Sequence, residues 1–68
     1  MSNKLYYDNV CNRCLDLSNL QLSPSDWINI LWCLNHQELL PPAIRVNIVD
    51  LRRTNITNIP NLKGILFV

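Results

Sequence analysis

The chain has 68 residues, of which 49% are apolar and 16% charged, and its formal net charge is +1. This length allows one small domain, in the range where burial of apolar surface only just offsets the entropy of the chain. The apolar content excludes an intrinsically disordered tail, and the near-neutral charge excludes binding to nucleic acid through a broad basic surface.

The sequence contains no evident signal for export or membrane insertion. Its apolar stretches are short and interrupted by Asn, Asp or Arg, so we expect no membrane-spanning helix. Residues 1–8 contain one lysine and no apolar run of the secretory type. The odd number of cysteines, three, argues against a closed disulfide framework. We therefore expect an intracellular protein, cytoplasmic or nuclear, in a reducing compartment.

We expect residues 1–68 to form a single small α+β domain in three parts: a metal-bound knuckle with a short strand, one central helix, and a region of strands and a turn. In the first part, residues 1–22, a tight knuckle is predicted at Cys11-x-x-Cys14. A short strand should follow it, with a break near residues 18–19. The residues that predict this strand are Leu15, Leu17, Leu20 and Leu22.

Residues 23–40 are predicted to form the central helix. Ser23 is a favourable N-cap, Pro24 suits the first helical position, and Asp26 can return a hydrogen bond to the cap. Pro41 and Pro42 should end the helix, because proline lacks an N–H donor and restricts the residue before it. The helix has two apolar stripes about 120° apart. One contains Trp27, Ile30, Leu31 and Leu34, and the other contains Ile28, Trp32 and Leu39.

A helix that is apolar on several sides needs more cover than so short a chain easily provides. We therefore expect a protein partner or a homo-oligomer. The predicted contact residues are Trp32, Leu39 and Phe67, since tryptophan is over-represented among residues that carry binding energy.

Residues 43–68 are predicted to contain strands and a turn, so that the whole domain has two or three short strands. Ile44, Val46 and Ile48 alternate with polar residues, which is the period of a half-buried strand. Residues 58–61 have the composition of a turn, and Gly64 opens a final apolar run over residues 65–68. We predict that this run is a strand within the sheet; the alternative is a peptide that docks on another molecule.

The pairs Cys11-x-x-Cys14 and Cys33-x-x-His36 have the same spacing and contain every cysteine and the single histidine. Zn²⁺ binds Cys₃His sets tetrahedrally, and a gap of two residues lets both members of a pair reach one ion. The motif resembles that of small structural zinc-finger modules, CxxC…CxxH, which implies a bound, non-catalytic zinc. Without metal, the cysteines would be small apolar residues of the core, and His36 a surface residue that compensates the helix dipole.

A second pattern lies over the same part of the chain. The leucine-rich-repeat consensus L-x-x-L-x-L-x-x-N/C-x-L is followed by Val46-x-x-Val49-x-Leu51-x-x-Thr54-x-Ile56, and residues 15–22 match its second half. The resemblance implies a strand, a turn and a helix in that order, and a parallel pairing of the segments near residues 15 and 49. The separation of these segments is longer than the usual length of such a repeat, and two units are fewer than the roughly three that bury a continuous core.

The sequence predicts no enzyme and no small-molecule substrate, because it has one histidine, one glycine and only scattered carboxylates. The expected function is a non-catalytic, zinc-stabilised interaction module that binds a protein partner. The small size and the Asn- and Ile-rich composition would suit a regulatory or viral or phage accessory protein. The alternatives are a leucine-rich-repeat-like scaffold and a nucleic-acid-binding zinc finger that uses Arg52, Arg53 and Lys63.

Overall fold

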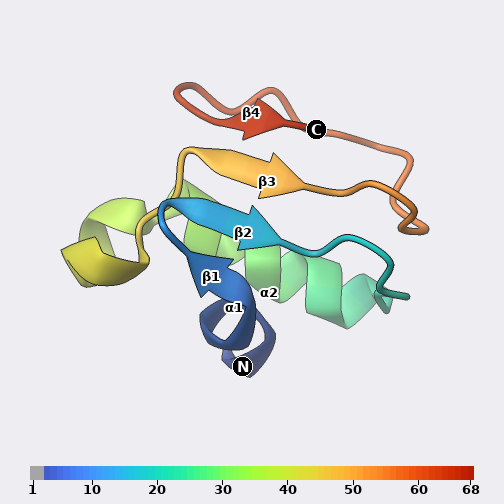
Figure 1. Ribbon diagram of the computed structural model, residues 1–68, viewed down its shortest axis with the longest axis horizontal. Helices are drawn as coiled ribbons and strands as arrows, with labels where there is room; N and C mark the ends of the chain where they lie inside the picture. Colours follow the sequence, from blue (N-terminus) through green and yellow to red (C-terminus); the bar gives the residue numbers. More distant parts are fainter. Residues whose placement is uncertain (1–2) are drawn as a thin grey trace.

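A four-stranded sheet and one main helix make up the computed structural model, which describes residues 3–68 (Figure 1). The strands lie in the order β1-β2-β3-β4, and α2 lies behind β2 in the view of Figure 1. The predicted α+β class with one main helix is confirmed, with four strands instead of two or three. In chain order the elements are α1 (Lys4–Asn9), β1 (Val10–Cys11), β2 (Cys14–Asp16), α2 (Pro24–Asn35), the 3-10 helices η1 (Gln37–Leu39) and η2 (Pro42–Ile44), β3 (Ile48–Asp50) and β4 (Leu66–Phe67).

The sheet is mixed. β1 and β2 are antiparallel, whereas β2 and β3, and β3 and β4, are parallel. Leu15 lies opposite Val49, and Val49 lies opposite Phe67. The parallel pairing near residues 15 and 49, which the repeat pattern predicted, is therefore confirmed. The strand predicted in the final apolar run is also confirmed, as β4.

The segment predicted to be a knuckle is a β-hairpin formed by β1 and β2. Its two turn residues, Asn12 and Arg13, have φ values of 50° and 64°. A turn with positive φ at both central residues matches the right-handed twist of the flanking strands. As a result, Cys11 and Cys14 lie directly opposite each other.

α2 begins where the sequence predicted and ends earlier. The Asp26 N–H donates to Ser23 Oγ, and the Ser23 N–H donates to the Asp26 carboxylate, both at 3.1 Å, so the capping box is complete. The helix ends at Asn35, so its predicted extension to residue 40 is wrong. The chain continues into the tighter 3-10 turn η1, in which the Leu40 N–H donates to the Gln37 carbonyl. The Val46 N–H donates to Gln37 Oε1 at 2.6 Å and ties this turn to the chain after η2.

The strand predicted from Ile44, Val46 and Ile48 is wrong in both position and phase. Ile44 ends η2, because Pro42 suits the start of a helical turn and not a strand. β3 begins only at Ile48, which is 37% exposed, and the fully buried residue of this strand is Val49. The strand therefore starts later than the sequence suggested, and Ile48 points outward instead of inward.

The turn predicted over residues 58–61 lies instead at Lys63 and Gly64. There the Ile65 N–H donates to the Leu62 carbonyl at 3.2 Å. Gly64 has a φ of 81°, a left-handed conformation that glycine adopts without a steric penalty. This turn sets the direction in which β4 enters the sheet.

α1 is absent from the sequence predictions. Its six residues are too few for a helical period to stand out. Tyr6 fixes the helix in place, since its ring is 1% exposed and its hydroxyl donates to the Ile44 carbonyl at 2.7 Å. Burial raises the pKa of Tyr6 to about 12. Tertiary packing therefore accounts for this helix better than local propensity does.

The core lies between α2, α1 and the face of the sheet that points toward them. A fully buried leucine or isoleucine contributes about 1.5–3 kcal/mol relative to an exposed one. The most deeply buried side chains are Tyr6, Leu15, Leu17, Ile30, Cys33 and Val49.

Candidate functional site

Two segments of the chain, residues 14–22 and residues 48–56, lie side by side, and we call them the first and second units. Leu15 of the first unit pairs with Val49 of the second. Two more backbone hydrogen bonds, both of 3.0 Å, continue the pairing past the ends of β2 and β3. The two units are therefore in register along their whole first half.

Each unit has the same side-chain turn at the end of its strand. The Ser18 N–H donates to Asp16 Oδ1 at 3.0 Å, and the Arg52 N–H donates to Asp50 Oδ1 at 3.0 Å. These two aspartates also lie opposite each other in the parallel pairing. An aspartate that accepts the N–H two residues later forms a local turn and ends the strand.

The backbone turn that follows is also the same in both units. The Leu20 N–H donates to the Leu17 carbonyl at 3.3 Å, and the Thr54 N–H donates to the Leu51 carbonyl at 3.2 Å. Each turn has one residue in the left-handed region: Asn19 with φ 65° and Arg53 with φ 59°. Side-chain turn, backbone turn and left-handed residue thus all recur at the same offset along the chain.

One face of the sheet points away from the core, and we call it the open face. Side chains alternate along a strand, so the residues on either side of Leu15, Val49 and Phe67 point away from α2. Within residues 3–68, no helix covers this face, which is the nearer one in Figure 1. Its side chains are Cys11, Cys14, Ile48 and Leu66 in one row and Asp16, Asp50 and Val68 in the next.

Three exposed apolar side chains lie together on the open face, over β3 and β4. Ile48 is 37% exposed, Leu66 62% and Val68 51%, and we call them the apolar patch. Ile48 and Leu66 are direct partners in the parallel pairing, and the Val68 N–H donates to the Val49 carbonyl at 2.9 Å. Grouped apolar side chains on an exposed sheet are typical of a contact surface.

A charged pair borders the apolar patch. The Arg52 guanidinium donates to both carboxylate oxygens of Asp50, with Nη2–Oδ2 at 2.8 Å and Nε–Oδ1 at 3.0 Å. These hydrogen bonds lower the pKa of Asp50 and raise the pKa of Arg52. The open face therefore has an apolar part and, next to it, a fixed pair of opposite charges.

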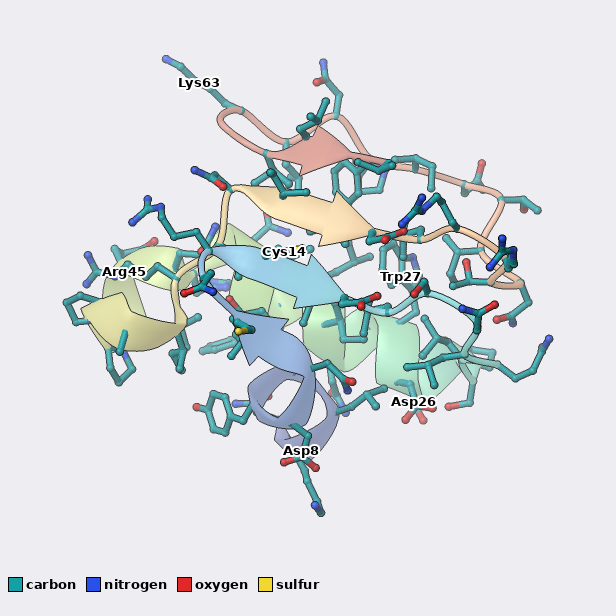
Figure 2. All side chains as sticks on the ribbon, viewed as in Figure 1. Asp8, Cys14, Asp26, Trp27, Arg45 and Lys63 are labelled. Atoms are coloured by element: carbon teal, nitrogen blue, oxygen red, sulfur yellow. The ribbon has the colours of Figure 1, made fainter. Side chains whose placement is uncertain are left out.

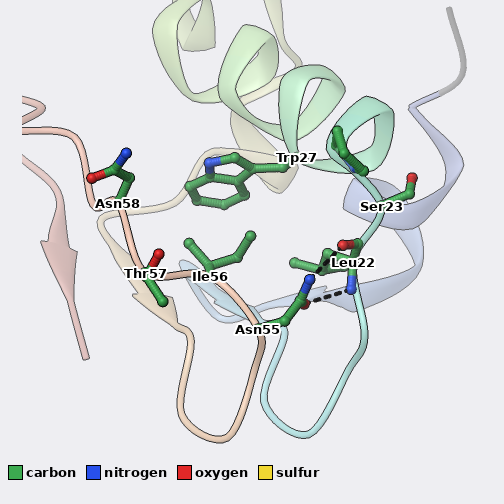
Figure 3. A pocket seen from close by; sticks show the side chains of 8 residues that line it. Leu22, Ser23, Trp27, Asn55, Ile56, Thr57 and Asn58 are labelled. Atoms are coloured by element: carbon green, nitrogen blue, oxygen red, sulfur yellow. Dashed lines mark hydrogen bonds between the residues drawn. The ribbon is translucent and has the colours of Figure 1, made fainter.

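A pocket of about 250 Å³ lies at the start of α2, between Trp27 and the loop that follows the second unit (Figure 3). The Trp27 ring lies over Ile56 on one side of it. Asn55 bridges the two units below, because its amide nitrogen donates to the Leu22 carbonyl and its amide oxygen accepts the Leu22 N–H, both at 2.8 Å. The Asn55 amide is therefore used within the chain, and the other polar side chains that line the pocket are those of Ser23, Thr57 and Asn58.

The four predicted zinc ligands divide between the two faces of the sheet. Cys11 and Cys14 lie together on the open face, whereas Cys33 is fully buried in the core on the side of α2. Among residues 3–68, no three His, Cys, Asp or Glu side chains gather as a metal site requires. This arrangement does not bring the four predicted ligands together. Zinc binding stays a prediction, which the moles of metal per chain in purified protein would test.

His36 is held by its own helix. Its Nδ1 donates to the Trp32 carbonyl at 2.7 Å, and its ring stacks on the Trp32 indole with centroids 4.3 Å apart and an angle of 18°. The backbone N–H of His36 caps the helix by donating to the Cys33 carbonyl. His36 therefore has a structural position at the C-terminal end of α2.

The predicted contact residues Trp32, Leu39 and Phe67 do not form one surface. Trp32 is half-buried under His36, and Leu39 in η1 is 66% exposed. Phe67 points to the inner face of the sheet and packs against the core. Of the three, only Leu39 offers a largely exposed apolar side chain to a partner.

The three basic residues of the nucleic-acid prediction are also separated. Arg52 and Arg53 lie just beyond the end of β3, after Leu51, whereas Lys63 precedes β4. Because β3 and β4 are parallel, these positions lie at opposite ends of the strands, and Figure 2 shows Lys63 in the loop before β4. Arg52 is in addition bound to Asp50.

The apolar patch was missed because the strand near Ile48 was predicted in the wrong phase. The signal that gives the right phase is the repeat itself, since it aligns Val49 and Leu51 with Leu15 and Leu17. With those residues inside, Ile48 must point outward. The register of the repeat thus predicts this surface better than the alternation of single residues does.

No protein-family model, curated protein or solved structure matches this chain. Of the helices in residues 3–68, none is long and apolar enough to cross a membrane.

Proposed function

We propose that this chain is a non-catalytic interaction scaffold of the leucine-rich-repeat kind, which binds a protein partner through the open face of its sheet. The observation that carries the proposal is the recurrence of the same strand, side-chain turn and backbone turn at a constant offset along the chain. In repeat proteins each unit buries its inner face against its neighbours and leaves the outer side of the strands free for binding.

The composition of the open face favours a protein as the partner. An apolar centre beside polar and charged residues is the usual anatomy of a protein interface. The apolar patch supplies the centre, and the Asp50–Arg52 pair supplies the polar border. A positively charged surface, which nucleic acid would require, is not brought together by the basic residues near this face.

Three substitutions at sites of matched exposure test this proposal. Leu66→Lys places a charge in the apolar patch, Ile28→Lys places one on α2, and Leu39→Lys places one on η1. The three native side chains are 62%, 61% and 66% exposed, so the substitutions should affect folding equally little. A protein captured by the wild-type chain would be purified and its Kd for each variant measured by calorimetry.

We expect Leu66→Lys to weaken the Kd about tenfold or more, and Ile28→Lys to leave it within about threefold. A loss in Leu39→Lys alone would assign the contact to the surface predicted around Trp32 and Leu39 instead. Equal binding by all three variants would contradict both surfaces.

Zinc stabilisation is a separate proposal with a different signature. A bound zinc would give one mole of metal per chain and a melting temperature that falls on chelation. The scaffold proposed above predicts instead that the pairing of the segments near Leu15 and Val49 survives EDTA. A nucleic-acid-binding protein would differ from both, since its retention would fall steeply with salt and depend on Arg52 and Arg53.

A further inference from the structure

The hairpin at the N-terminal edge of the sheet brings two thiols together on the open face. Cys11 ends β1 and Cys14 begins β2, and the two residues are direct partners across the antiparallel pair. Directly opposed residues in an antiparallel pair point to the same side of the sheet. Both side chains therefore leave the sheet on the face away from Leu15, which is fully buried.

The spacing of this pair is compatible with a disulfide bond. Residues directly opposite in an antiparallel pair have Cα atoms about 4.5–5.5 Å apart, which lies within the range of about 4.4–6.8 Å found in disulfides. Their Cβ atoms lie about 4.5–5.5 Å apart, somewhat more than the roughly 3.5–4.5 Å of a disulfide. A small adjustment of a hairpin whose first strand has two residues can close this difference.

The two thiols differ in access from each other and from the third. Cys11 is exposed, Cys14 is half-buried, and Cys33 is fully enclosed by the core. Figure 2 shows Cys14 on β2, the strand between β1 and β3. A small disulfide in solution therefore reaches Cys11 first, while Cys14 is held next to it and Cys33 is out of reach.

We propose that Cys11 and Cys14 are a reversible dithiol–disulfide pair, which exchanges with low-molecular-weight disulfides of the glutathione type. The Cys11 thiolate attacks one sulfur of oxidised glutathione and forms a mixed disulfide, and one glutathione thiolate leaves with the electron pair of the broken S–S bond. The Cys14 thiolate then attacks the Cys11 sulfur and displaces the second glutathione thiolate. The hairpin loses two electrons and two protons, and oxidised glutathione is reduced to two glutathione molecules.

The experiment uses the full chain, folded, in EDTA so that no metal protects the thiols. Wild type, Cys14→Ser and Cys11→Ser are incubated with oxidised glutathione, quenched with acid, alkylated after unfolding and weighed by mass spectrometry. Circular dichroism before the reaction verifies that each variant is folded.

We expect the wild type to become two hydrogens lighter and to retain one alkylatable thiol, Cys33. Because Cys14 is held opposite Cys11, the mixed disulfide should not exceed about a tenth of the wild-type chains. Cys14→Ser should instead accumulate one glutathione per chain on Cys11. Cys11→Ser should react more slowly than Cys14→Ser, since Cys14 is less accessible.

A lasting glutathione adduct on the wild type would overturn the proposal, and so would a covalent dimer. Unmodified Cys11 and Cys14 in wild type, under conditions that modify Cys14→Ser completely, would overturn it as well. None of these results depends on the protein partner proposed above, because the reaction involves only the hairpin and the glutathione pair.

Discussion

The two units of the sheet begin in the same way and then follow different paths. After the first unit the chain enters the 12-residue helix α2 and returns to the sheet at β3. After the second unit it forms no helix or strand through residues 57–62, turns at Gly64 and returns at β4. The stretch of chain between paired residues is accordingly much longer from Leu15 to Val49 than from Val49 to Phe67.

The difference lies in the residues that could start a helix. In the first unit Ser23 caps the helix and Asp26 completes the capping box. The equivalent positions after the second unit hold Thr57 and Pro60. Proline has no N–H to donate to a cap at this position, so the second unit cannot form the same helix start. The strand and turn of a unit therefore do not determine the path by which the chain returns to the sheet.

The largest expected difference between the units concerns their last residues, Leu22 and Ile56. Leu22 is 4% exposed, whereas Ile56 is only half-buried, although the Trp27 ring of α2 lies over one side of it. Leu22→Ala should lower the free energy of unfolding by about 2–4 kcal/mol, and Ile56→Ala by about 1–2 kcal/mol. Urea unfolding followed by far-UV circular dichroism measures both. Equal losses would show that the second unit is as well packed as the first.

Asn55 and its counterpart Gln21 give the next largest contrast. Asn55→Ala removes the partner of both the N–H and the carbonyl of Leu22, which are partly buried. We expect a loss of about 1–3 kcal/mol in the free energy of unfolding. The Gln21 side chain makes no hydrogen bond within residues 3–68, so Gln21→Ala should change stability by less than about 0.5 kcal/mol. A similar loss in both variants would contradict a specific role for the Asn55 bridge.

The helix cap tests the proposed cause of the different return paths. Ser23→Ala removes the hydroxyl that accepts the Asp26 N–H and should cost about 1 kcal/mol. Thr57→Ala at the equivalent position should have an effect below about 0.5 kcal/mol, because Thr57 is exposed and caps no helix. Thermal unfolding at two protein concentrations would measure both changes and detect any oligomer. A cost for Thr57→Ala as large as for Ser23→Ala would mean that Thr57 has a structural role that its place in the second unit does not explain.

The left-handed residues of the two turns predict a smaller change of opposite sign. Arg53 has φ 59°, a conformation that asparagine adopts more readily than arginine, and the first unit has Asn19 in this place. Arg53→Asn should raise the free energy of unfolding by about 0.5 kcal/mol, and Asn19→Arg should lower it by a similar amount. The contact between Arg53 Nη1 and Asn19 Oδ1 is exposed and 3.5 Å long, so its loss should matter little. Chemical denaturation of both variants gives the signs, and a loss in Arg53→Asn would contradict the argument.

The smallest predicted effect is on the stability of the fold at acid pH. Hydrogen bonds from Arg52 hold the pKa of Asp50 below its ordinary value of 3.8. The folded state therefore binds this proton more weakly than the unfolded state, and the resulting stability is complete above the ordinary pKa. This contribution to stability is lost as the pH falls through the pKa that Asp50 has in the folded state. Between about pH 5 and about pH 2, Asp50→Asn should lose less stability than the wild type. Asp16→Asn serves as the matched control, since the residue two positions after Asp16 is Ser18 and not an arginine. If the free energy of unfolding fell with pH equally in Asp50→Asn and in wild type, the Asp50–Arg52 pair would be excluded as the source of the acid dependence.

Part of this fold follows from local sequence alone. Ser23, Pro24 and Asp26 mark the start of α2, because a capping box satisfies N–H groups within a few residues. The spacing of Leu15 and Leu17, repeated by Val49 and Leu51, predicted the parallel pairing, since the same strand pattern buries the same face. These features depend on neighbours in the chain or on a pattern that recurs.

Other features were decided only by the tertiary structure. The spacing of Cys33 and His36 lets them share a helix face, yet it does not determine on which side of the sheet that helix packs, and the sheet separates them from Cys11 and Cys14. α1 exists because Tyr6 is buried, which so short a segment cannot predict. The sequence by itself determined where segments start and how they repeat. Which side chains meet was decided by packing, because contacts between distant segments depend on how the whole chain buries its apolar surface.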